Sequence, residues 1–162
     1  MEKCNEKGRF EITEILEFVI SEDDSNQRYA IEIGYVNEVY SIKNVTMLPC
    51  TPAFIVGIMN FRGKIISVID IRNFLGFTMK KVHEDKVKKV IVVNCDEIEV
   101  GIAVDGILGC RDIVLSEIQK NVLTITNFNT NYFKGITKER SIVLNIKNIM
   151  MDEKIIVNED VI

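Results

Sequence analysis

Two apolar, β-branched runs meet at a short polar interruption in the middle of the chain, and this pattern limits how the chain can fold. The first run follows Pro52, the second spans Lys64 to Ile71, and the sequence Asn-Phe-Arg-Gly at 60–63 separates them. Such runs on either side of a turn predict a β-hairpin. Gly63 can adopt the positive φ that a tight turn needs, which leaves Arg62 exposed at the tip. An exposed arginine on a rigid turn is typical of a protein-binding anchor.

The rest of the chain consists largely of short apolar runs bounded by turn residues. Strands are expected at 15–20, 29–33, 36–42, 45–48, 90–95, 99–104 and 141–146, and short helices at 70–75, 116–119 and 147–151. Many short strands separated by turn signals predict an all-β barrel or sandwich.

A weak internal repeat supports two related bodies. Residues 68–75 resemble residues 143–150, and residues 29–36 resemble residues 100–107. These pairs predict two small barrels, which close their own sheet edges. We expect barrel lobes at roughly 14–82 and 83–151, joined through the lysine-rich segment near 78–89, with room for strands to be exchanged between lobes. Residues 1–13 and 152–162 are expected to be tails.

Composition and charge exclude several classes of protein. The 162 residues are 47% hydrophobic and carry a net charge of −4, which argues against a general nucleic-acid binder. The lysine-rich run at 80–89 is interpreted as a solvated linker. No apolar run approaches the roughly 18 residues that span a bilayer, and the polar residues 1–7 do not resemble a signal peptide. The chain is therefore expected to be cytoplasmic.

Side chains for catalysis or metal binding are scarce. His83 is the only histidine, so no Ser-His-acid arrangement is expected, and no glycine-rich phosphate loop occurs. The four cysteines are Cys4, Cys50, Cys95 and Cys110, and their wide spacing supports neither a zinc site nor a disulfide framework. Cys95 and Cys110 are expected to be small core residues. We expect no catalytic residue, metal or cofactor.

Three carboxylates have two interpretations each. Asp70 and Asp105 end strands, where an aspartate more often caps a helix or fixes a turn than forms a carboxylate pair. Glu38 is either an ordinary solvent-side carboxylate or a partner that orients Arg62 through a charge-assisted hydrogen bond. Spacing alone favours the first interpretation.

Several motifs in order resemble the CheW family of chemotaxis coupling proteins. They cover residues 51–55 with Gly57, 60–63, 68–72, 100–107, 132–136 and 143–146, so the resemblance extends over roughly residues 14–151. The departures are Phe61 and Ile71, where leucine is usual, and the run at 108–111.

The resemblance implies two five-stranded, SH3-like β-barrels that share a hydrophobic core and have no catalytic activity. It implies a cytoplasmic adaptor, which joins membrane-bound receptor arrays only through its partners. These partners are the regulatory domain of a CheA-type histidine kinase and the cytoplasmic tip of methyl-accepting chemoreceptors. On the kinase-binding side it places Arg62, Glu38, Gly57 and Gly63. In a receptor-binding groove between the barrels it places Leu16, Ile33, Val36, Val39 and Ile107.

Within that groove, exposure is expected to differ. Val36 and Ile107 occupy equivalent strand ends in the repeat and are expected to be exposed, whereas Leu16, Ile33 and Val39 could equally belong to the core. Alternatives to this function come from inside and outside the family. A coupling protein of the same family could serve surface motility or a transcriptional output, and a small barrel could bind oligonucleotides. A hydrolase is disfavoured, because no nucleophile has a histidine base.

Overall fold

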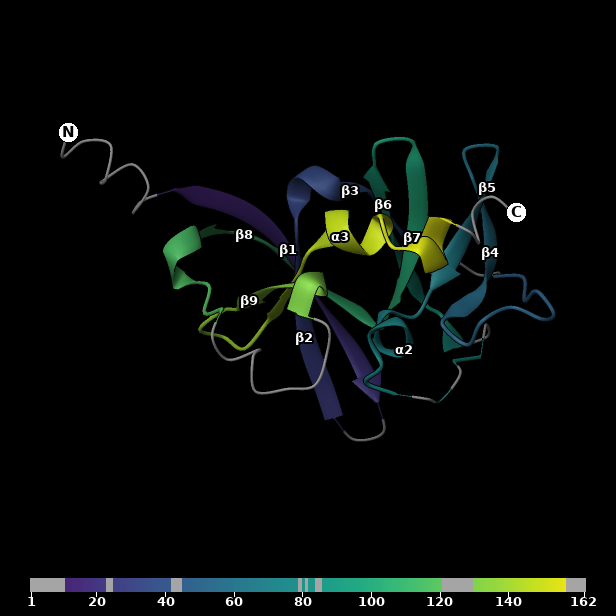
Figure 1. Cartoon of the computed structure of the whole chain (residues 1–162), viewed down its shortest axis with the longest axis horizontal. Helices are drawn as coiled ribbons and strands as arrows, with labels where there is room; N and C mark the ends of the chain where they lie inside the picture. Colours follow the sequence, from purple (N-terminus) through teal and green to yellow (C-terminus); the bar gives the residue numbers. More distant parts are fainter. Residues whose placement is uncertain are drawn as a thin grey trace. The chain divides into compact units, whose positions relative to one another are not determined.

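The computed structural model describes residues 11–22, 25–41, 45–78, 80, 82–83, 86–120 and 130–156, and the protein is mostly β-strand (Figure 1). The strands are β1 (Ile12–Glu22), β2 (Ser25–Glu32), β3 (Val36–Ser41), β4 (Ile55–Phe61), β5 (Lys64–Ile69), β6 (Lys89–Cys95), β7 (Ile98–Val104), β8 (Gly106–Val114), β9 (Phe133–Ile136) and β10 (Ile142–Leu144). The helices are α2 (Ile71–Leu75) and α3 (Ile146–Met150), with a helical turn at 153–156 and single 3₁₀ turns at Ile33–Tyr35, Leu115–Glu117 and Thr130–Tyr132.

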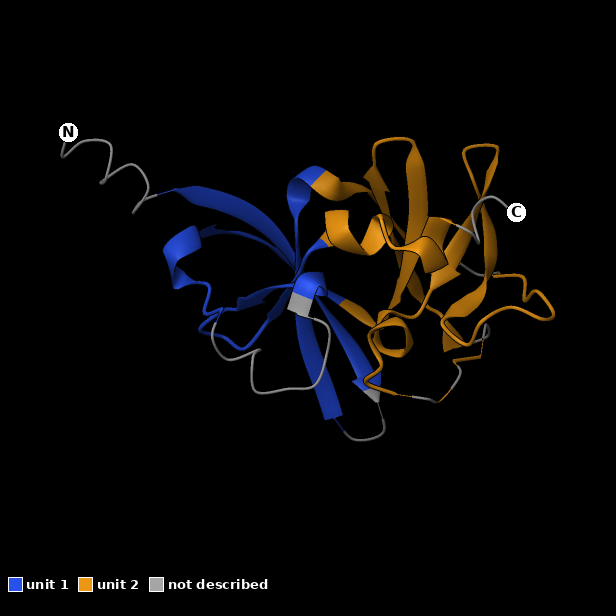
Figure 2. Ribbon diagram, viewed as in Figure 1, with its two compact units in different colours: residues 1–34, 107–145 blue, residues 35–106, 146–162 orange. Residues whose placement is uncertain are grey.

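The chain divides into two compact units, each built on a five-stranded sheet (Figure 2). Unit 1 comprises residues 1–34 and 107–145, with the strand order β8-β1-β2-β10-β9. Unit 2 comprises residues 35–106 and 146–162, with the order β3-β6-β7-β5-β4. The all-β class is thus confirmed. The division expected near residue 82 lies inside unit 2, because β3 and β5 pair with β6 and β7 from the other half of the sequence.

The internal repeat corresponds to a structural one. Val68 on β5 lies beside Gly101 on the parallel strand β7, and Val143 on β10 lies beside Ala30 on the parallel strand β2. One strand of each parallel pair is followed by a short helix: α2 follows β5, and α3 follows β10. The two sequence matches therefore describe equivalent positions in the two sheets.

The core of unit 2 includes an apolar cluster. It contains Val45, Val56, Met59, Phe61, Ile66, Val68, Val90, Val92 and Ala103. Gly57 lies in this core, and a Cβ there would come within 2.4 Å of the carbonyl oxygen of Thr46. The absence of a side chain thus lets residues 45–46 approach β4. The strand expected at 45–48 is reduced to an isolated bridge between Thr46 and Ile58, so that prediction was wrong.

In unit 1, Ile15, Ala30, Ile113, Ile118 and Val143 form an apolar cluster.

The core assignment is confirmed for Cys95, which is buried, and wrong for Cys110, which is exposed. Side chains alternate along β8, and Cys110 lies on its exposed side.

Helix α2 begins where the sequence predicted. The Asp70 carboxylate accepts a hydrogen bond from the backbone N–H of Arg72 at 3.0 Å, and Gly76 ends the helix with φ 84°. The helix-cap interpretation of Asp70 is confirmed. Within the described ranges, no helix has the length and apolar character needed to cross a membrane.

Parts of some predicted segments lie outside the described residues. These are residues 1–10, with Cys4, and 157–162 of the two expected tails, Ile42 of the strand expected at 36–42, and Met79, Lys81, Glu84 and Asp85 of the lysine-rich segment. In the described part of the expected C-terminal tail, Ile155 is buried.

Candidate protein-binding site

The β4–β5 hairpin closes through two residues in an unusual conformation. Phe61 pairs with Lys64, so the turn consists of Arg62 and Gly63, with φ values of 50° and 81°. Two-residue hairpin turns with positive φ at both positions favour Asn-Gly, because L-residues with larger side chains are strained there. The Gly63 N–H also donates to Asn60 Oδ1 at 3.0 Å. The positive φ predicted for Gly63 is confirmed, and Arg62 shares it.

The Arg62 guanidinium is exposed but held in place. Its Nη2 donates to Glu38 Oε2 at 2.7 Å, and its central carbon lies 5.1 Å from the centroid of the Phe61 ring. The side chain remains 63% exposed. The hydrogen bond and charge of Glu38 raise the pKa of Arg62 above its ordinary value, so the guanidinium keeps its charge. Glu38 is thus a partner of Arg62, and the preference drawn from spacing alone was wrong.

Tyr40 completes this arrangement and was missed from the sequence. Its hydroxyl donates to Glu38 Oε2 at 3.1 Å, and its ring meets the Phe61 ring edge-on at 5.4 Å. Burial and the hydrogen bond to Glu38 raise the pKa of Tyr40, so the hydroxyl stays protonated and able to donate. We call Glu38, Tyr40 and Phe61 the Arg62 cradle. The available signal was strand alternation, which places residues 38 and 40 on one face of β3.

The residues expected to bind the receptor fall into both units, and each is described within its own. In unit 1, Leu16 is buried, and Ile33 and Ile107 are half-buried. In unit 2, Val36 is half-buried and Val39 is 39% exposed. The expected ranking of Val36 above Val39 was wrong, because burial alternates along β3 and Val39 lies on its exposed side, opposite Val36.

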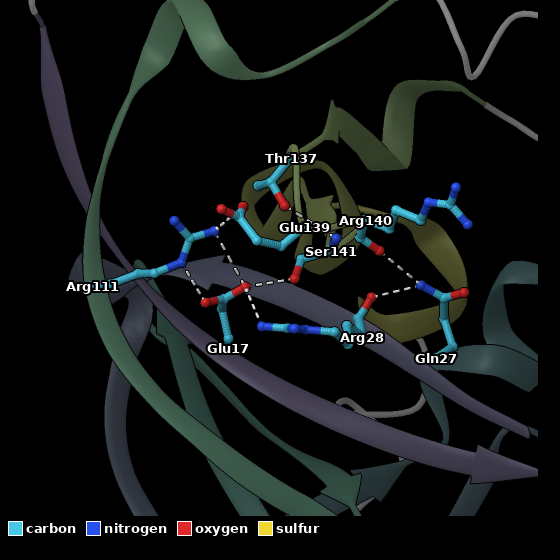
Figure 3. Close-up of polar contacts among 8 residues, drawn as sticks. All are labelled: Glu17, Gln27, Arg28, Arg111, Thr137, Glu139, Arg140 and Ser141. Carbon is cyan, nitrogen blue, oxygen red and sulfur yellow. Dashed lines mark hydrogen bonds and ion pairs between the residues drawn. The ribbon is translucent and has the colours of Figure 1, made fainter.

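Unit 1 contains an ionic network around the buried Glu17, which is 4% exposed (Figure 3). Its carboxylate accepts hydrogen bonds from Arg111 Nε and from the Ser141 hydroxyl, both at 2.5 Å, and Arg28 Nη2 lies 3.4 Å away. Arg111 also pairs with Glu139 at 2.6 Å. Burial raises the pKa of Glu17, but these hydrogen bonds and positive charges outweigh it, and the pKa lies below its ordinary value.

This network fixes strands rather than forming a reaction site. It joins β1 and β2 to β8 and to the β9–β10 turn, and its buried carboxylate is saturated by donors. Nowhere in the described residues do three His, Cys, Asp or Glu side chains gather as metal ligands.

The fold and the site define a small β protein with an exposed, charge-paired hairpin. The family model of the CheW-like domain matches residues 14–154, and the chain belongs to this family. The chemotaxis protein CheW of Thermotoga maritima is 32% identical over 154 residues, which cover 91% of this chain and 93% of that protein. The chemotaxis protein CheW of Klebsiella aerogenes is 31% identical over 139 residues, which cover 84% of this chain and 82% of that protein.

A solved structure agrees with these relatives. The scaffolding protein TtCheW of Thermoanaerobacter tengcongensis superposes with a TM-score of 0.69 at 28% identity, covering 88% of this chain and 94% of that one. The resemblance seen in the motifs is confirmed. The relatives do not favour the oligonucleotide-binding alternative or a coupling protein for another output.

Proposed function

We propose that this protein is a non-catalytic adaptor that couples methyl-accepting chemoreceptors to a CheA-type histidine kinase in a chemotaxis array. Relatives named chemotaxis protein CheW and a structural neighbour described as a scaffolding protein support the proposal. The adaptor would work in the cytoplasm and reach the membrane only through its partners.

The conformation of Arg62 carries the proposal. An L-residue in the left-handed region costs about 1–2 kcal/mol, and glycine or asparagine would occupy this turn at lower cost. Strain at an exposed side chain is more common at functional sites than elsewhere. Arg62 is strained, exposed and oriented by a carboxylate, which is the arrangement of an interface anchor.

On the kinase-binding side, Arg62 supplies the contact and the other proposed residues support it. Glu38 fixes the direction of the guanidinium, Gly63 completes the turn, and Gly57 lets β4 pack against residues 45–46. An arginine held in one orientation loses less conformational entropy on binding than a free one.

On the receptor-binding side, the exposed and half-buried apolar residues are the proposed contacts. They are Val36 and Val39 in unit 2 and Ile33 and Ile107 in unit 1, with Leu16 beneath the surface as support. An amphipathic receptor helix would lay its apolar stripe against such side chains. Because both partners are held at once, weak single contacts gain from a high effective concentration.

Calorimetric titration with the kinase regulatory domain tests the kinase side. Arg62→Ala should weaken binding by about 1–3 kcal/mol, as expected for an interface arginine. Arg140→Ala is a matched control, since Arg140 is also an exposed arginine with positive φ, at 65°, but lies in a hairpin of unit 1. Equal losses in both variants would mean that binding follows net charge. Wild-type affinity in folded Arg62→Ala would contradict the assignment.

A further inference from the structure

Tyr40 touches both groups that hold Arg62. Its hydroxyl donates to the same Glu38 oxygen that accepts from Arg62, and its ring packs against the Phe61 ring that lies under the guanidinium. Tyr40 itself is half-buried and packs against the core of unit 2. It therefore connects the packed core to Glu38 and Phe61, the two direct supports of the exposed Arg62.

The position of these residues in the sheet explains why such a support is needed. β3 and β4 lie at opposite ends of the strand order of unit 2, and Arg62 follows β4 whereas Glu38 lies on β3. The Arg62–Glu38 pair thus joins two edges that share no strand pairing among the described residues. Exposed ion pairs of this kind contribute little by themselves, because solvent screens them and long side chains lose entropy. A second donor on Glu38 and a packed ring under Arg62 restrict both side chains.

We propose that Tyr40 is the positioning residue of the Arg62 site, and that the cradle presents the outer side of the guanidinium to a carboxylate of the protein partner. Among the described residues Arg62 makes its one ion pair through Nη2, and its side chain stays 63% exposed. A guanidinium with free parallel N–H groups fits a carboxylate in two-point contact. The inference rests on the proposed function, since it takes the partner to be the kinase regulatory domain.

Affinity for that domain is the first test. Tyr40→Phe keeps the ring and removes the hydroxyl, and it should lower the affinity about 3- to 10-fold, the range expected when one long side chain must be ordered on binding. Tyr35→Phe, which removes the hydroxyl of a half-buried residue of unit 2 outside the cradle, should leave the affinity unchanged. Unchanged affinity in Tyr40→Phe would overturn the proposal.

A double-mutant cycle separates positioning from a direct or structural role. If Tyr40 acts through Arg62, adding Tyr40→Phe to Arg62→Ala should produce no further loss. If the two losses multiply, Tyr40 contributes independently, and its role as a positioning residue is refuted.

A measurement without the partner keeps this inference distinct from the proposed function. The ¹⁵N relaxation of the Arg62 Nε–H group should show an ordered side chain in the wild type and a mobile one in Tyr40→Phe, with Tyr35→Phe behaving as the wild type. Equal order in all three would overturn the cradle whatever the kinase affinity. Loss of order in Tyr40→Phe, in a wild type that binds no kinase domain, would leave the cradle intact and refute the proposed function.

Discussion

Units 1 and 2 share one strand order, and each has an ion pair between an edge strand and a hairpin turn, but the acid and the cation change places. In unit 2 the edge strand β3 supplies the acid, Glu38, and the neighbouring hairpin supplies the cation, Arg62. In unit 1 the edge strand β8 supplies the cation, Arg111, and the β9–β10 turn supplies the acid, Glu139. The Arg62 side chain is 63% exposed and the Arg111 side chain 32%.

The buried residue on the neighbouring strands accounts for the different exposure of the two arginines. Glu17 pairs with Ala30, and the corresponding residue of unit 2, Val92, pairs with Gly101. Unit 1 thus has a buried carboxylate that holds Arg111 half-buried, whereas the corresponding residue of unit 2, Val92, is apolar and offers Arg62 no buried partner. The edge pair of unit 2 is therefore available at the surface. The same sheet yields a structural ion pair or an exposed one according to a single buried position.

The largest effect should come from removing the buried acid. Glu17→Ala leaves Arg111 and Arg28 without their carboxylate and should lower the free energy of unfolding by about 2–4 kcal/mol, less than for a fully buried pair because both arginines are partly solvated. Glu38→Ala should cost less than about 1 kcal/mol. Urea denaturation of both variants measures the contrast, and similar losses would mean that the two pairs are energetically alike.

Acid should destabilise unit 1 through Glu17. Its pKa in the folded state lies below the ordinary value of 4.5, so the unfolded chain binds the proton more readily and stability falls as the pH drops from about 5 through the lowered pKa. Thermal midpoints between about pH 3 and pH 6 should fall more steeply in the wild type than in Glu17→Gln. Parallel curves would show that Glu17 is not the group that titrates.

The smallest effect concerns the two strained arginines. Arg140→Asn should raise the free energy of unfolding by about 0.5–1 kcal/mol, because asparagine tolerates the left-handed region better. Arg62→Asn relieves the same strain but loses the ion pair to Glu38, so its change should lie close to zero. The difference between the two variants estimates the contribution of that pair. A large loss in Arg62→Asn would mean that the pair is structural.

The features that could be predicted depend on residues close to one another in the sequence. The Gly63 turn, the Asp70 cap and the repeat linking residues 68–75 to 143–150 follow from local patterns, and the structure has all three. The division into units did not follow, because a repeat has the same pattern whether its strands pair within one half of the chain or across the two halves.

Features that depend on distant residues could not be predicted in this way. Glu17 lies in an ordinary alternating strand, and only the fold brings Arg111 and Ser141 to it. Alternation puts Val36 and Val39 on opposite sides of β3, but which side faces solvent depends on how the sheet packs. The partnership of Glu38 and Arg62 likewise required the two edges of a sheet to meet.

The claim that the exposed pair of unit 2 serves binding, whereas the pair of Arg111 with the buried Glu17 in unit 1 serves stability, is tested most directly by the affinity of Arg62→Asn for the kinase regulatory domain. Asparagine suits the turn, so the hairpin and the fold should persist while the guanidinium is lost. The account predicts affinity at least about 5-fold weaker, with a free energy of unfolding close to that of the wild type. Wild-type affinity in this variant would contradict it.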